Sequence, residues 1–309
     1  MRLSYFLFAL TFGTASSAQT VTTTLPSLAG IIGDLTRGVA TAESLLPANT
    51  DPHHFTMAPS QIKTINSATR IFAIGQDMEP WLERLEPNLA EGTVIHLGEI
   101  EPVHPYLLDA RHFGEDPEDE HEGEEGHEDE HGEEHDEHED EHAHGVIDPH
   151  MWLSPSILGV WAEEITHSLS ADMPEHAEAL SANLDVFKTD LAEINADLAA
   201  ISASFATSDI RIVVTHDAFQ YLEAHLGLSQ AGMLSDIQDN PAGARSLSAV
   251  TRLTGDICLI VDPNEPLPES ILPQAKHAVI DPLGTAFIGQ AHYTLSFFRA
   301  ITQALSSCL

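Results

Sequence analysis

Apolar residues along 174–207 recur at alternating steps of three and four, the spacing that keeps one stripe on one face of a helix. This stripe consists of Ala177, Leu180, Leu184, Phe187, Leu191, Ile194, Leu198 and Ile201. No Gly or Pro interrupts it after Pro174, and proline is tolerated in a first helical turn. The pattern predicts one helix of roughly 30 residues, about 45 Å long.

On both sides of this helix, short β-branched runs alternate with helix-length segments. Strands are expected at 21–24, 70–74 and 93–97, and again at 210–215, 257–261 and 278–280, with shorter helices at 78–85 and 269–276. Alternation of this kind is typical of right-handed βαβ units with parallel sheets. We therefore predict an α/β fold with an N-terminal lobe (19–173), a linking helix (174–207) and a C-terminal lobe (208–309). A coiled-coil helix for self-association is the alternative.

Residues 1–18 have the features of a cleavable export signal. Arg2 precedes an apolar run at 5–12, and Ser16 and Ala18 fit the small-residue rule for cleavage. The run is too short to span a membrane. We expect an exported protein whose mature chain starts at Gln19.

The chain carries a formal net charge of −37, which excludes nucleic acid as an expected partner. The tract 115–144 contains 18 of the 49 acidic residues and seven of the 19 histidines. We expect a disordered acidic loop over about 114–145, because this composition cannot bury apolar area.

The histidines of this loop are His121, His127, His131, His135, His138, His142 and His144. They are candidate accessory zinc ligands that would raise the local zinc concentration; a solvated charge run with incidental affinity is the alternative. The His-Glu-x-x-His spacing of zinc peptidases occurs twice in the loop, but no apolar face there would hold the helix that a peptidase needs.

Four other residues form a candidate metal site. His53, His150, His216 and Asp281 all stand at the ends of expected elements, where ligand sites of open α/β sheets gather. Two precede the linking helix and two follow it, so a site built from them would lie between the lobes. Three neutral imidazoles and one carboxylate suit Zn²⁺, whereas oxygen-rich sites favour manganese. Because the imidazoles must be neutral, zinc affinity is expected to fall as the pH drops toward and below about 6.5, the reference pKa of histidine.

The two cysteines, Cys258 and Cys308, leave two interpretations open. Export permits a disulfide, which would tether the C-terminal helix to the second sheet. Two free buried thiols are the other possibility.

Five motifs resemble one known family, the periplasmic zinc-binding receptors of ABC importers, of the ZnuA type within the metal-binding cluster A-I solute-binding proteins. They are Asp51–Ser60 (DPHHFTMAPS), Ile74–Glu79 (IGQDME), His150–Pro155 (HMWLSP), Val214–Phe219 (VTHDAF) and Ile280–Thr285 (IDPLGT). They span the mature chain in the family's order.

The resemblance implies that His53, His150 and His216 bind zinc and that Asp281, a water or Glu79 takes the fourth position. Manganese receptors of this family have a carboxylate where this chain has His216, which favours zinc. One departure concerns His54, because the residue after the first ligand is usually acidic or otherwise polar in relatives.

The resemblance also implies a rigid linking helix that limits closure and a disulfide between Cys258 and Cys308. The acidic tract stands where this type carries its variable loop.

The expected function is binding without catalysis. A monomer in a Gram-negative periplasm would capture Zn²⁺ and deliver it to a membrane permease with its ATPase. The alternatives are a manganese or iron receptor of the same fold, an exported zinc hydrolase, and a zinc buffer without a transporter. A hydrolase would need an open coordination position and a positioned general base.

Overall fold

The computed structural model describes residues 19–48, 50–111, 146–264 and 271–309. The predicted export signal and the acidic tract lie outside these residues. No helix of the described part is long and apolar enough to cross a membrane.

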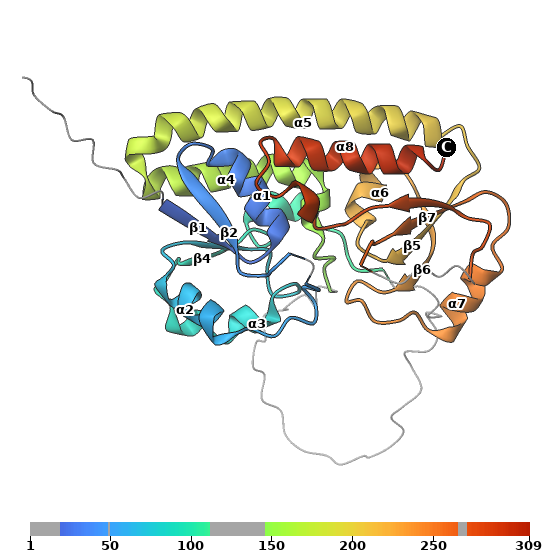
Figure 1. The fold of residues 1–309 in the computed structure, drawn as a ribbon, viewed down its shortest axis with the longest axis horizontal. Coiled ribbons are helices and arrows are strands. Elements are labelled where there is room, and N and C mark those ends of the chain that lie inside the picture. The colour runs from blue at the N-terminus through green and yellow to red at the C-terminus, as the bar shows by residue number, and fades with distance from the viewer. Residues whose placement is uncertain (1–18, 49, 112–145, 265–270) are drawn as a thin grey trace, which may run out of the picture.

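Two separate parallel sheets form the centres of two α/β lobes (Figure 1). The first sheet has the order β2 (Ala40–Ser44), β1 (Gln19–Thr23), β3 (Ile71–Ala73) and β4 (Val94–His96). The second has the order β6 (Gln230–Ser235), β5 (Arg211–His216), β7 (Ile257–Val261) and β8 (Lys276–Val279). All six pairings are parallel. The expected α/β class with parallel sheets is confirmed.

Helices cover both faces of the first sheet, whose central strand β3 is apolar and buried on both sides. Helices α1 (Pro26–Leu35) and α4 (Pro155–Asp172) pack on the face that includes Phe72. Helices α2 (Pro59–Ser67) and α3 (Pro80–Glu83) cover the opposite face, where Ile71 and Ala73 contact Ile65 and Leu82 in a smaller cluster. Of the helix predicted at 78–85, only the four residues of α3 are helical.

The second sheet follows the same rule with α6 (Gln220–Leu226), α7 (Ala244–Thr251) and α8 (Tyr293–Ser306). One face of this sheet packs against α7, where Val213 and Leu259 form a cluster with Val250 of the helix. Alternate residues such as Ile212 and Ile260 belong instead to the main core. The predicted helix at 269–276 is wrong in its described part, because Lys276 begins β8.

The linking helix α5 (Ala177–Phe205) has 29 residues and follows a 3₁₀ turn at Pro174–His176. It runs along both lobes, with α4, α8 and α1 beneath it (Figure 1). Its buried apolar side chains are Leu180, Phe187, Leu191, Ile194, Leu198, Ile201 and Phe205. The predicted stripe therefore faces the protein, and it packs on this chain's own helices.

The C-terminal helix also reaches across the molecule. Asp34 of α1 is buried, and its two carboxylate oxygens accept hydrogen bonds from the backbone N–H groups of Tyr293 (3.0 Å) and Thr294 (2.9 Å) at the start of α8. A carboxylate at a helix N-terminus satisfies donors that lack a partner within the helix. Helix α8 thus ties the second lobe to the first.

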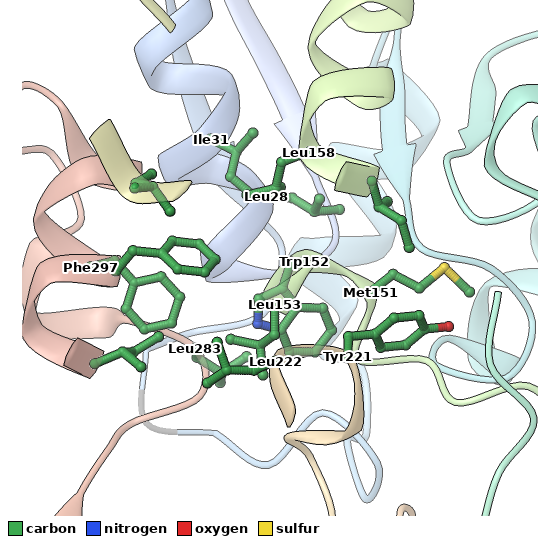
Figure 2. Close-up of a cluster of buried hydrophobic side chains, with 14 of the residues drawn as sticks. Leu28, Ile31, Met151, Trp152, Leu153, Leu158, Tyr221, Leu222, Leu283 and Phe297 are labelled. Carbon is green, nitrogen blue, oxygen red and sulfur yellow. The ribbon is translucent and has the colours of Figure 1, made fainter. Parts of the chain in front are cut away.

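Side chains of both lobes meet in one hydrophobic core. Figure 2 shows Leu28, Ile31 and Leu158 above Trp152 and Leu153, Leu222 and Leu283 below them, and Phe297 to their left. The indole Nε1 of Trp152 donates a hydrogen bond of 2.7 Å to the carbonyl of Pro282. Because close-packed interiors resist deformation, this core holds the lobes in a fixed relation.

The expected disulfide joins Cys258 of β7 to Cys308, which follows α8, with a Cα–Cα distance of 5.4 Å. Both cysteines are fully buried. The bond fixes the end of the chain to the second sheet.

Candidate metal centre

Three histidines from three distant segments converge between the lobes. One ring nitrogen from each of His53, His150 and His216 lies within 4.8 Å of the others. The three ring centroids are 5.1 to 5.4 Å apart. Within the described residues this is the one such group of three or more His, Cys, Asp or Glu side chains.

His53 belongs to the loop between β2 and α2. Asp51 shapes this loop: its Oδ1 accepts the backbone N–H of His53 at 2.8 Å, and its Oδ2 lies 2.7 Å from Nδ1 of His54. His54 is therefore held on the exposed side of the loop, while His53 faces the cluster. The Nε2 atom of His53 is buried and has no hydrogen-bond partner among the described residues, as expected for an atom that awaits a ligand.

His150 caps the 3₁₀ turn at Met151–Leu153 and is almost completely buried. Oδ1 of Asp148 lies 2.8 Å from its Nδ1 and accepts its backbone N–H at 2.9 Å. The ring is thus fixed with Nε2 toward the cluster. A carboxylate behind a histidine is the usual support of a metal-binding imidazole, because it sets the tautomer and raises the basicity of the ligand.

His216 is the last residue of β5, where it pairs in register with Ser235 of β6. Its Nε2 lies 3.2 Å from Nε2 of His150. Its Nδ1 points to the opposite side, where Ser235 Oγ lies at 3.5 Å and Asp239 Oδ1 at 3.6 Å. A hydrogen bond between the two Nε2 atoms requires a proton on one of them, and a metal ion would take its place.

Burial keeps the three imidazoles neutral. Loss of solvation lowers the pKa of His53 to about 4 and the pKa values of His150 and His216 to about 3. Repulsion between the rings lowers the pKa further at His53 and His216. Metal binding requires the neutral form, so these histidines are ready to coordinate at neutral pH.

A cavity of about 250 Å³ opens at the cluster. Its lining includes the three histidines together with Asp51, Asp239 and Asp262. Burial and the neighbouring carboxylates raise the pKa of Asp262 to about 6. Negative groups that line a cavity attract a divalent cation.

The two residues expected to complete the ligand set do not join the cluster. Asp281 accepts hydrogen bonds from the backbone of Leu283 and from the backbone and hydroxyl of Thr285, so its carboxylate closes its own turn. Glu79 is buried against Thr24, Ile74 and Gly75, and burial raises its pKa to about 7. Neither residue belongs to the group of side chains whose ligand atoms lie within 4.8 Å of one another, so a fourth ligand from either stays a prediction. The predicted accessory histidines of the acidic loop lie outside the described residues.

Sequence reasoning missed Asp148, Asp239 and Asp262. Asp148 stands two residues before His150, and this spacing is a usable signal because an aspartate readily bonds the backbone two residues ahead. No local pattern pointed to Asp239, which reaches the site through a turn after β6.

Two comparisons concern curated relatives. The high-affinity zinc uptake system protein ZnuA of Paracoccus denitrificans is 31% identical over 100% of this chain and 99% of its own length. The protein of the same name from Yersinia pestis is 29% identical over 100% of this chain and 96% of its own.

A solved crystal structure of ZnuA shares the fold, with a TM-score of 0.69 at 22% identity, covering 94% of this chain and 99% of the other. The model of the family "Zinc-uptake complex component A periplasmic" matches residues 21–308. Because this match covers nearly the whole chain, and the fold and the histidine cluster agree with it, the chain belongs to the ZnuA family of periplasmic zinc-uptake components.

Proposed function

We propose that this protein captures Zn²⁺ at His53, His150 and His216 and delivers it to an ABC importer. The observation that carries the proposal is the convergence of three neutral imidazoles on one cavity between the lobes. Zinc is commonly bound by three histidines with a further position left for water or a carboxylate. The names of the relatives from Paracoccus denitrificans and Yersinia pestis support the same cargo.

The donor atoms favour zinc over manganese. Three nitrogen donors suit zinc, whereas manganese prefers sites rich in oxygen. Asp281 and Glu79, the carboxylates that would have made the set richer in oxygen, both bond elsewhere. With both carboxylates bonded in this way, water fills the fourth position.

Delivery requires a membrane permease and its ATPase, and we propose these as partners of a periplasmic monomer. The proposed activity is binding without a chemical step. A zinc hydrolase would need a positioned general base. The two carboxylates that the sequence offered as a base are engaged otherwise: Asp217 pairs with Arg111, and Glu79 accepts the backbone N–H of Gly75. The acidic tract is proposed as an accessory that collects zinc for the cavity.

Zinc titration of the mature protein lacking residues 115–144, with manganese as competitor, tests this proposal. The same titration of the His216→Ala variant serves as the comparison. The expected result is one tight zinc per chain that manganese does not displace and that the variant loses. If tight binding disappears with the tract alone, the tract is the zinc binder and the proposed site is wrong.

A further inference from the structure

The Nδ1 atom of His216 lies on the side of the ring away from the cluster, and no carboxylate oxygen of the described residues is within hydrogen-bond distance of it. Its Nε2 faces Nε2 of His150 at 3.2 Å, so Nε2 is the atom available to a cation. A histidine that binds metal through Nε2 carries its proton on Nδ1, and that proton needs an acceptor. His150 has Asp148 at 2.8 Å for this purpose. At Nδ1 of His216 the closest carboxylate oxygen is Oδ1 of Asp239, at 3.6 Å.

We propose that Asp239 is a positioning residue for His216, whose carboxylate accepts the Nδ1–H of the imidazole when Nε2 binds the cation. The inference rests on the proposed zinc site. A separation of 3.6 Å is too long for a hydrogen bond, so the contact must shorten on capture. Bound metal withdraws electron density from the ring, which makes Nδ1–H a stronger donor to a carboxylate.

The turn after β6 is built to present this carboxylate. Oδ1 of Asp236 accepts the backbone N–H groups of Gln238 and Asn240, each at 2.9 Å. These bonds place Asp239 in the left-handed region at φ 60°, which it shares with His292 alone among the non-glycine residues of the described segments. A left-handed conformation is unfavourable for a residue with a side chain, and Asp and Asn adopt it more readily than most. The surrounding hydrogen bonds hold a conformation that Asp239 would otherwise avoid.

A second contact fixes the orientation of the carboxylate. Oγ of Ser235 lies 2.8 Å from Oδ1 of Asp239 and 3.5 Å from Nδ1 of His216. Ser235 is the residue that pairs with His216 across the two strands. The hydroxyl thus connects the carboxylate to the strand that carries the ligand.

The other carboxylates of the cavity are differently engaged. Asp51 bonds the backbone of His53 and the ring of His54, and Asp262 bonds Asn264. Neither makes a hydrogen bond or ion pair with the ring of His150 or His216 within the described part of the chain. Asp262 carries the same charge and lines the same cavity. Its replacement by asparagine therefore serves as the matched control for charge alone.

The test uses the full mature chain loaded with Co²⁺ for visible absorption and titrated with Zn²⁺ against a chromophoric chelator. The variants are Asp239→Asn and Asp239→Gly, and the control is Asp262→Asn. His216→Ala serves as the reference, because its spectrum shows only Co²⁺ bound outside the cavity. Glycine removes the side chain and still accepts the left-handed backbone. Asparagine keeps an acceptor oxygen but loses the charge.

We expect zinc affinity to fall about 10- to 100-fold in Asp239→Gly, by less in Asp239→Asn, and by no more than about threefold in Asp262→Asn. The Co²⁺ absorption bands should shift in the Asp239 variants alone, because ligand orientation changes only there. Unchanged bands and affinity in both Asp239 variants, with binding abolished in His216→Ala, would overturn the inference. Equal losses in Asp239→Gly and Asp262→Asn would also overturn it, since charge alone would then suffice. Retained affinity in His216→Ala would instead refute the zinc site itself.

Discussion

His150 and His216 stand in different lobes, 66 residues apart in the chain, yet their Nε2 atoms lie 3.2 Å apart. The segment that carries His150 continues into Trp152, whose indole bonds the second lobe at Pro282. The same packing that joins the lobes therefore also sets the distance between two candidate ligands. A change in how the lobes pack would therefore change the distance between these two nitrogen atoms.

Zinc binding is expected to leave the overall dimensions almost unchanged. The shared core, α5 and the bond between Asp34 and the start of α8 all oppose a wide hinge motion. Small-angle scattering of the protein lacking 115–144, with and without zinc, should give radii of gyration that agree within the spread of repeated measurements. A clear compaction on zinc binding would contradict a rigid connection.

Zinc affinity should be nearly flat from pH 7.5 to about 5 and decline steeply only near pH 4 and below. The sequence-based expectation used the ordinary histidine pKa of 6.5, but burial lowers the pKa values of the three histidines to between about 3 and about 4. Protons therefore compete with zinc only below these values in the folded protein.

The measurement is a chelator competition series across pH on the variant lacking 115–144, corrected for the chelator's own protonation. An affinity that falls tenfold per unit from pH 6.5 would mean that the imidazoles are solvated.

The lowered pKa values of the three histidines also predict that the metal-free fold is less stable in acid. Their folded pKa values lie below the unfolded value, so between pH 6.5 and about 4 the unfolded state binds more protons than the folded state. Stability from these groups is complete above pH 6.5 and is lost as the pH falls through this window. Zinc should offset the loss, since it binds the folded form. Thermal unfolding with and without zinc at pH 7.5 and 5.5 checks this difference.

Replacing Asp148 by alanine should weaken zinc binding by about 10- to 100-fold, because His150 loses the group that fixes its tautomer and orientation. Asp148→Asn should lose less, since the amide oxygen still accepts from Nδ1. Isothermal titration in the background lacking 115–144 measures both. Asp109→Asn, at an exposed position in the neighbouring segment, is the control and should match the parent protein. Equal affinity in Asp148→Ala and the parent would show that Asp148 has no part in ligand positioning.

Arg111→Ala should destabilise the fold by up to about 3–5 kcal/mol, the cost of leaving a buried charge without its partner. Its guanidinium lies 2.5 Å from Asp217 and 2.7 Å from Glu223, two carboxylates of the second lobe that are almost fully buried. Urea unfolding of the protein lacking 115–144 measures the change. The matched control is Arg299→Ala, which removes an exposed arginine that also pairs with two carboxylates. Its cost should stay below about 1 kcal/mol, and similar losses in both variants would contradict the difference in burial.

Removing the disulfide with paired Cys258→Ser and Cys308→Ser substitutions should cost about 4 kcal/mol of unfolding free energy by the loop-entropy relation for a separation of 50 residues. Zinc affinity should remain that of the parent, because neither cysteine lines the metal cavity. Denaturant unfolding and zinc titration on the same preparations separate the two effects. A loss of zinc affinity without a loss of stability would place the bond in the binding mechanism.

The periodicity of the chain determined the fold class, because a buried face imposes its spacing on neighbouring residues. The stripe from Leu180 to Ile201 and the β-branched runs of β1, β3, β5 and β7 are local signals of this kind. Short segments carry a weaker periodic signal than long ones. Residues 271–275 form turns and coil in place of the predicted helix, and pairing with β7 begins at Lys276, two residues before the predicted strand at 278–280.

The positions of His53, His150 and His216 at element ends also followed from the sequence, since the ends of parallel strands meet at one edge of a sheet. Tertiary structure alone decided what surrounds them. The turn after β6 brings Asp239 to His216, and α8 reaches back to Asp34 in the first lobe. Such contacts join residues from separate turns, strands and lobes, and their geometry depends on how the lobes pack rather than on any pattern along the chain.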